Sequence, residues 1–103
     1  MEPRAFLERC RQLSIDDLSH TKTIFHFLAS MNCELGEFAG ELKIEDKVPG
    51  HGHRKVEEGT LGEGVDVVIC ALALYFGRGG TVEHLVEYGH KKLTKWEGNV
   101  GKP

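Results

Sequence analysis

The sequence predicts an all-α fold of three to four helices in a single domain over residues 1–103. Apolar residues recur at alternating spacings of three and four, as in an amphipathic helix packed against another helix. No segment shows the period-two alternation of a half-buried strand. With 40% hydrophobic residues the chain can form a core, although a chain of 103 residues is near the size at which a partner subunit helps.

The first half of the chain is expected to form two helices. Pro3 suits the first turn of a short helix over 3–13, and Ser14 has the chemistry of a cap for a long acidic helix over 15–45. The pattern leaves open an interruption of this long helix near 19–23. Its seam consists of Thr21, Ile24, Leu28, Met31, Leu35, Phe38 and Leu42.

A connector and two further helices are expected in the second half. Pro49, Gly50 and Gly52 rule out a regular helix within the connector, 46–57. The helix over 58–77 is apolar nearly all round, so we expect it to be buried on several sides. In so short a chain the missing cover is a second subunit, which predicts a homodimer or a dimer of dimers (a homotetramer).

The last helix is expected over 81–97. The sequence "GRGG" ends the preceding helix, and Thr81 caps the new one. The tail "GNVGKP", residues 98–103, is expected to be mobile.

Composition argues against several classes of protein. The net charge of −3 provides no basic footprint for nucleic acid. The longest apolar run, 67–76, is too short to span a bilayer, and the N-terminus lacks the apolar segment of a secretory signal. Three cysteines without a CxxC pair indicate free thiols in a reducing compartment. We therefore expect a cytoplasmic protein without nucleic-acid or membrane partners.

Two pairs of acids carry the functional argument. Glu34 and Glu37 lie one helical turn apart beside the seam of the long helix, and Glu63 and Asp66 do the same at the start of the most apolar helix. If the two helices pack antiparallel, four carboxylates converge. Ligation by oxygen alone suits Mg²⁺ or Mn²⁺. Glu41, one turn further along the same edge, is a second-tier candidate.

Simpler interpretations stand beside this one. Glu63 can complete a T-x-x-E capping box with Thr60. Glu34, Glu37 and Glu41 can form a solvated face, the usual place of a run of charges. Asp66 is harder to dismiss, because it precedes three apolar residues and a buried charge is costly unless it is paired or coordinated.

The two motifs and their contexts resemble those of the MazG-like, all-α nucleoside triphosphate pyrophosphohydrolases. That family shares E-x-x-E followed by E-x-x-D, which read here as "ELGE" at 34–37 and "EGVD" at 63–66 with 25 residues between them. The contexts "ELGEFAGEL" and "EGVDVVICALAL" are also similar, and the resemblance covers about 23–96.

The resemblance implies a function and a site. The function is Mg²⁺-dependent hydrolysis of a nucleoside triphosphate between the α and β phosphates, with Mn²⁺ as a substitute metal. The implied metal ligands and catalytic residues are Glu34, Glu37, Glu63 and Asp66. Candidates for contacts with the nucleotide are Lys92, Lys95, Trp96, Arg54, Lys55 and Phe27, although basic residues of this kind are more often solvated surface and aromatic ones core.

Alternatives remain open at this stage. A phosphoribosyl-ATP pyrophosphohydrolase or a dUTPase of the same superfamily would use a similar site. An inactive helical module that assembles through its apolar helix is a rival of a different class, and a salt bridge between Asp66 and Lys92 would then account for the buried acid.

Overall fold

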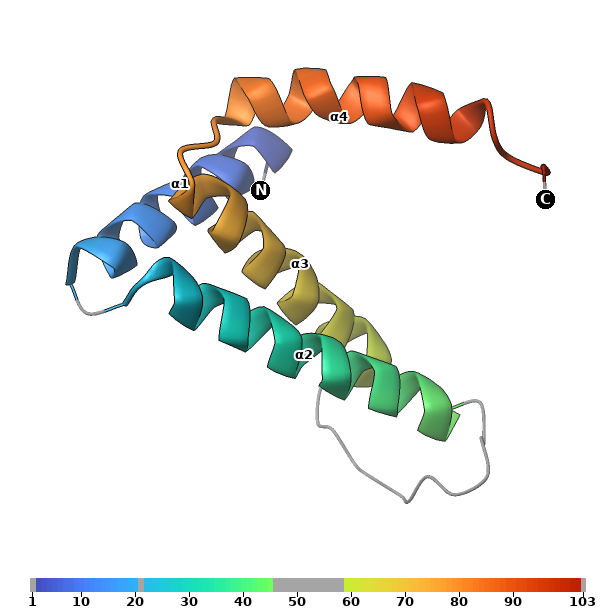
Figure 1. Cartoon of the computed structure of the whole chain (residues 1–103), viewed down its shortest axis with the longest axis horizontal. Helices are drawn as coiled ribbons and strands as arrows, with labels where there is room; N and C mark the ends of the chain where they lie inside the picture. The colour runs from blue at the N-terminus through green and yellow to red at the C-terminus, as the bar shows by residue number, and fades with distance from the viewer. Residues whose placement is uncertain (1, 21, 46–58, 103) are drawn as a thin grey trace.

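The computed structural model describes residues 2–20, 22–45 and 59–102, and every regular element within these ranges is an α-helix (Figure 1). The helices are α1 (Pro3–His20), α2 (Ile24–Glu45), α3 (Gly59–Gly77) and α4 (Val82–Glu97). The predicted all-α class is confirmed. The predicted connector, 46–57, lies outside the described residues.

The predicted helix boundary at Ser14 is wrong. Ser14 lies inside α1 with 4% of its surface exposed, and its hydroxyl donates to the carbonyl of Cys10 at 2.8 Å. A serine that bonds the preceding turn in this way does not serve as a cap. The chain leaves helical geometry at 22–23, within the interval 19–23, and the Thr23 amide donates to Nδ1 of His26 at 3.0 Å.

Helices α2 and α3 form an antiparallel pair, and α1 packs across α3 (Figure 1). The end of α3 approaches the α1–α2 turn closely, because a Cβ on Gly77 would lie 2.9 Å from Cδ1 of Ile24 and 3.1 Å from Cδ1 of Leu18. Glycine therefore permits this packing. The α2–α3 pair holds the predicted acidic residues.

A sharp turn separates α3 from α4. Gly79 has φ of +93°, and a Cβ on Gly80 would lie 2.3 Å from the ring of Tyr75. Both positions therefore favour glycine. As predicted, Thr81 caps α4, because its hydroxyl accepts from the backbone N–H of His84 at 3.0 Å. In the predicted mobile tail, backbone hydrogen-bonded turns continue to Lys102.

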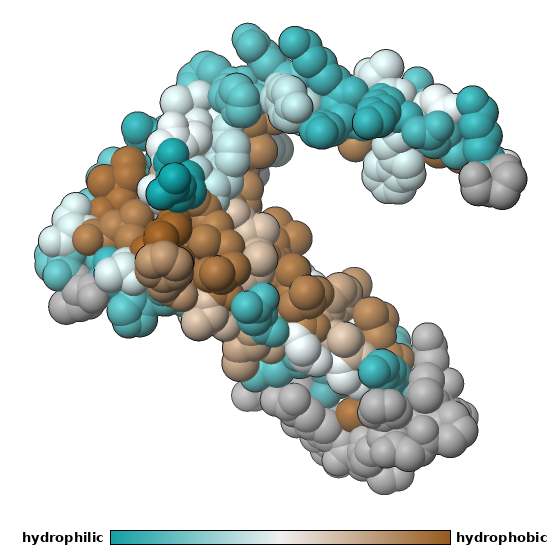
Figure 2. All heavy atoms as spheres, viewed as in Figure 1, coloured by the Kyte–Doolittle hydropathy of each residue, from teal (hydrophilic) through white to brown (hydrophobic). Residues whose placement is uncertain are grey.

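The core of a single chain is small. Among the described hydrophobic residues, only Phe27, Phe76 and Val82 are almost completely buried. The accessible surface is 7906 Å², against about 5,800 Å² for a compact monomer of this mass. The radius of gyration is 16.2 Å, against about 13 Å for a compact chain of this length. Figure 2 shows hydrophobic side chains over much of the surface.

Helix α3 is less buried within one chain than its composition predicts. Val65 and Val68 are each 53% exposed. By length and composition alone, α3 is apolar enough to cross a membrane, although the run 67–76 by itself is not. This is weak evidence for a span, because a helix enclosed between protein subunits has the same composition.

Candidate functional site

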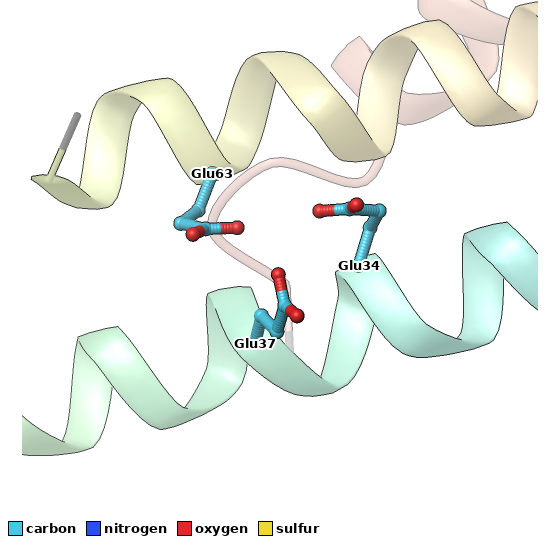
Figure 3. A group of neighbouring side chains, drawn as sticks. All are labelled: Glu34, Glu37 and Glu63. Carbon is cyan, nitrogen blue, oxygen red and sulfur yellow. The ribbon is translucent and has the colours of Figure 1, made fainter. Parts of the chain in front are cut away.

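Three glutamates from two helices meet at one place on the α2–α3 pair. Glu34 and Glu37 of α2 and Glu63 of α3 each offer a carboxylate oxygen, and these oxygens lie within 4.8 Å of one another. Figure 3 shows the three carboxylates turned toward a common point between the helices. The spacing of three residues places Glu34 and Glu37 on one face of α2, and the antiparallel packing brings Glu63 opposite them.

The environment of this cluster opposes negative charge. Glu63 is only 4% exposed, and Glu34 and Glu37 are half-buried. Burial raises the pKa of Glu34, and the charges of Glu37, Asp66 and Glu63 raise it further, as does the hydrogen bond to Glu37. Oε2 of Glu34 is buried without a hydrogen-bond partner. A buried carboxylate in this setting is stabilised by a proton or by a cation.

The fourth predicted ligand, Asp66, lies outside this group of three. Asp66 is half-buried one turn beyond Glu63, and its charge raises the pKa of both Glu34 and Cys70. Within the described residues it makes no ion pair with Lys92. The salt bridge that would explain Asp66 without a ligand is therefore absent from this arrangement.

Glu41 is more buried than its place in a run of charges indicated. It is 7% exposed, and its Oε1 is buried without a hydrogen-bond partner. A solvated face is therefore the wrong interpretation for this residue. Its spacing of four from Glu37 was the only signal in the sequence, and spacing alone does not separate burial from exposure.

The capping-box interpretation of Glu63 also fails. Thr60 lies within α3, and its hydroxyl donates to the carboxylate of Glu45 on α2. Glu63 faces the cluster with Glu34 and Glu37 (Figure 3).

Two thiols border the cluster. The acidic motifs gave no reason to include them in the predicted site. Cys33 is exposed, and its thiol donates to Oε1 of Glu37 at 3.8 Å. Burial raises the pKa of the Cys70 thiol, and the charges of Glu34 and Asp66 add to the effect, with a smaller contribution from Cys33.

A pocket of about 390 Å³ lies between α1, α2 and α3. Phe27 and Ala73 form part of its wall. Phe27 lies seven residues before Glu34 on α2, and Ala73 lies seven residues after Asp66 on α3. Seven residues of helix span about 10 Å and return to the same face, so pocket and carboxylates share one side of the α2–α3 pair. The lining residues are Phe6, Arg9, Cys10, Leu13, Ser14, Asp17, Phe27, Ile69 and Ala73.

The predicted nucleotide contacts on α4 are not at the cluster. Lys92, Lys95 and Trp96 lie on α4, which extends away from the α2–α3 pair (Figure 1). The ammonium of Lys92 sits 5.2 Å from the centre of the Tyr88 ring, and Trp96 is 68% exposed. Arg54 and Lys55 lie outside the described residues.

Comparison with known proteins adds no relative: no protein-family model matches the chain, and neither does a curated protein or a solved structure.

Proposed function

We propose that this chain is a magnesium-dependent nucleoside triphosphate pyrophosphohydrolase that cleaves between the α and β phosphates, releasing a nucleoside monophosphate and pyrophosphate. The observation that carries the proposal is the meeting of Glu34, Glu37 and Glu63 within 4.8 Å on two facing helices. The E-x-x-E and E-x-x-D motifs supply these residues, and Asp66 lies one turn away. The proposed cellular location is the cytoplasm, and the proposed assembly is a homodimer or homotetramer.

The donor set fits a hard divalent cation. Carboxylate oxygens suit Mg²⁺ and Mn²⁺, whereas zinc sites are usually built with nitrogen or sulfur ligands. Glu34, Glu37 and Glu63 would hold the ion directly, and Asp66 would complete the set from the next turn of α3. When bound, the ion supplies positive charge for the triphosphate and lowers the pKa of a coordinated water.

The chain itself contributes position and proton acceptance. The α2–α3 pair fixes the carboxylates relative to one another, so little reorganisation is needed when the substrate binds. One of the glutamates would accept a proton from the attacking water, and Oε2 of Glu34, which is buried without a hydrogen-bond partner, is one candidate for this role.

The pocket beside the carboxylates provides a place for the nucleoside. A volume of about 390 Å³ is within the range of small-molecule sites. Phe27 forms part of its wall as a buried apolar surface, and Arg9 and Asp17 offer a donor and an acceptor to a base or sugar. Phe27 in this wall and Glu34 are about two helical turns, roughly 10 Å, apart along α2.

Product analysis tests the reaction. Each ribo- and deoxyribonucleoside triphosphate, and phosphoribosyl-ATP, is incubated with the protein and Mg²⁺, and the phosphate products are identified. We expect monophosphate and pyrophosphate, loss of activity with EDTA, and loss of at least two orders of magnitude in Glu37→Gln and Asp66→Asn. Glu87→Gln, an exposed acid on α4, is the matched control.

The alternatives give different results in the same assay. Preference for phosphoribosyl-ATP or for dUTP would identify the corresponding member of the superfamily. Release of orthophosphate would show that a different bond is broken. Absence of hydrolysis on every substrate would favour the inactive assembly module.

A further inference from the structure

The pocket between α1, α2 and α3 takes most of its wall from one face of α1. Phe6, Cys10, Leu13 and Asp17 recur at spacings of three and four and so share this face, and Arg9 lies at its edge. Among the lining residues only Arg9 and Asp17 are charged. The pocket thus presents apolar walls and two charged groups to a ligand.

The polar groups of this pocket differ in whether they already have partners. The hydroxyl of Ser14 donates to the carbonyl of Cys10 at 2.8 Å, and Oδ2 of Asp17 accepts from Nζ of Lys22 at 2.9 Å. Within the part of the chain that the structure describes, Arg9 takes part in no ion pair. Arg9 is exposed, so water satisfies its donors in the free protein. Its guanidinium is therefore the strong hydrogen-bonding group that the pocket can offer to a ligand.

A guanidinium at the wall of such a pocket favours one kind of base. It carries only donors, which are held in a planar fork. Guanine presents two acceptors side by side, O6 and N7, and the fork binds both at once. Adenine and cytosine carry an amino group on the corresponding edge, and an amino group opposes a donor. Uracil and thymine offer the single oxygen O4, beside the N3–H donor. Guanine is therefore the base that matches Arg9 best.

The pocket adjoins the acidic cluster along both helices of the α2–α3 pair. Ile69 in its wall lies three residues, or one helical turn, after Asp66 on α3. Phe27 lies two turns before Glu34 on α2. A nucleotide whose phosphates are held at the cluster thus has an apolar pocket for its base on the same side of the helix pair. The Phe27 ring provides a surface on which a base can pack.

We infer that Arg9 binds O6 and N7 of a guanine base in this pocket, so that the site selects guanine nucleoside triphosphates. The inference rests on the proposed function, because it takes the acidic cluster as the place of the phosphates. In this arrangement Arg9 is a specificity-determining residue, since it contacts the base and not the reacting phosphates. Its replacement should alter the choice between nucleotides more than the rate of hydrolysis at saturation.

Comparison of nucleotides tests the selection. In the wild type, kcat/KM for GTP and dGTP should exceed that for ATP and dATP by roughly 5- to 150-fold, the range of a bidentate contact between arginine and guanine. Arg9→Leu should lose this preference. Arg9→Lys should lose it as well, because lysine keeps the charge but not the fork. Arg11→Leu is the matched control, because Arg11 does not line the pocket. Equal kcat/KM for GTP and ATP in the wild type overturns the inference. So does an equal loss on every nucleotide in Arg9→Leu, which would place Arg9 on the phosphates.

A substrate analogue tests the contact at a single atom. In 7-deaza-dGTP a C–H group replaces N7, and every other group of dGTP is retained. The wild type should hydrolyse it with a kcat/KM about tenfold below that for dGTP, because one hydrogen bond to a charged group is lost. In Arg9→Leu the two nucleotides should be equivalent. Equal kcat/KM for the two nucleotides in the wild type contradicts the contact with N7.

Binding of 2′-deoxyguanosine in EDTA separates this inference from the proposed function. The nucleoside has no phosphate and EDTA removes divalent metal, so an NMR titration reports on the pocket alone. We expect shifts in the signals of Phe6, Phe27 and Ile69, weaker binding of 2′-deoxyadenosine, and loss of the preference in Arg9→Leu. If the wild type hydrolyses no nucleotide but gives this result, the proposed function fails and the guanine site stands. Equal binding of the two nucleosides, or no binding of either, overturns the guanine site.

Discussion

Replacement of Glu34 by glutamine should stabilise the metal-free protein and remove most of its stabilisation by Mg²⁺. In the wild type, Glu34 lies within 4.8 Å of two other carboxylates. Each repulsion amounts to about 3.5 kcal/mol at that distance with an effective dielectric constant near 20. Water on the half-exposed side weakens it, so we expect a net gain in unfolding free energy of about 1–3 kcal/mol.

Binding of Mg²⁺ should stabilise the wild type more than it stabilises Glu34→Gln. A cation at a hundred times its dissociation constant stabilises the folded wild type by about 2.7 kcal/mol. For a domain of this size that is a rise in Tm of about 10–20 °C. Glu34→Gln should show only a small part of this rise, because one ligand is lost and the remaining carboxylates carry less charge.

The pH dependence follows from the raised pKa of Glu34. Its folded-state pKa lies above the ordinary value of 4.5, so the folded protein binds a proton more readily than the unfolded chain. The contribution of Glu34 to the stability of the metal-free protein therefore falls as pH rises between these two pKa values, and it stays low above them. Mg²⁺ affinity should fall as pH decreases through the raised pKa, because protons compete with the ion.

Thermal unfolding followed by circular dichroism at fixed protein concentration provides the measurement. Wild type, Glu34→Gln and the control Glu87→Gln are compared in EDTA and in saturating Mg²⁺ over a range of pH. The reasoning is refuted if Glu34→Gln lowers the Tm of the metal-free protein, or if it retains the full shift with Mg²⁺.

Three further predictions concern residues around the site and the turn. Glu41→Gln should raise the unfolding free energy of the metal-free protein by about 1 kcal/mol, because it removes charge from a buried oxygen without a hydrogen bond. Denaturant titration, with exposed Glu87→Gln as the control, measures this change. Cys70 should react with iodoacetamide more slowly than exposed Cys33, because its pKa is raised, and equal rates by mass spectrometry at mildly alkaline pH would contradict this. Gly80→Ala should lower the unfolding free energy by about 1–3 kcal/mol, because the new methyl group meets the Tyr75 ring. Gly36→Ala, which has open space around it, should raise the unfolding free energy by about 0.5–1 kcal/mol in the same experiment.

The sequence was most informative where local chemistry decides the structure. The ends of α3 and α4 lie within one residue of their predicted positions, because glycines and a capping threonine mark them. For the first half of the chain, the sequence predicted a helix boundary at Ser14 and left open an interruption near 19–23. Only tertiary packing decides between them, since it buries Ser14 inside a continuous α1.

The same contrast between local chemistry and tertiary packing holds for the candidate site. Helical spacing and antiparallel packing predicted that Glu34, Glu37, Glu63 and Asp66 would converge, and the first three meet in the structure. Spacing does not determine how far each helix is rotated about its axis. For this reason it predicted neither the offset of Asp66 nor the burial of Glu41. The direction of α4, and with it the position of Lys92, depends on the backbone at Gly79 and Gly80 and on no periodic pattern.

The glycine turn before α4 has a consequence for the geometry of assembly. A rigid projecting arm generates a closed ring only when its angle returns the last copy to the first, and otherwise it propagates as an open-ended filament. In this chain, that angle is set by a few backbone torsions beside the Tyr75 ring. A side chain added at Gly80 would meet the Tyr75 ring and force these torsions to change. If the proposed assembly is built through α4, one substitution at this turn would therefore decide between a finite particle and a polymer.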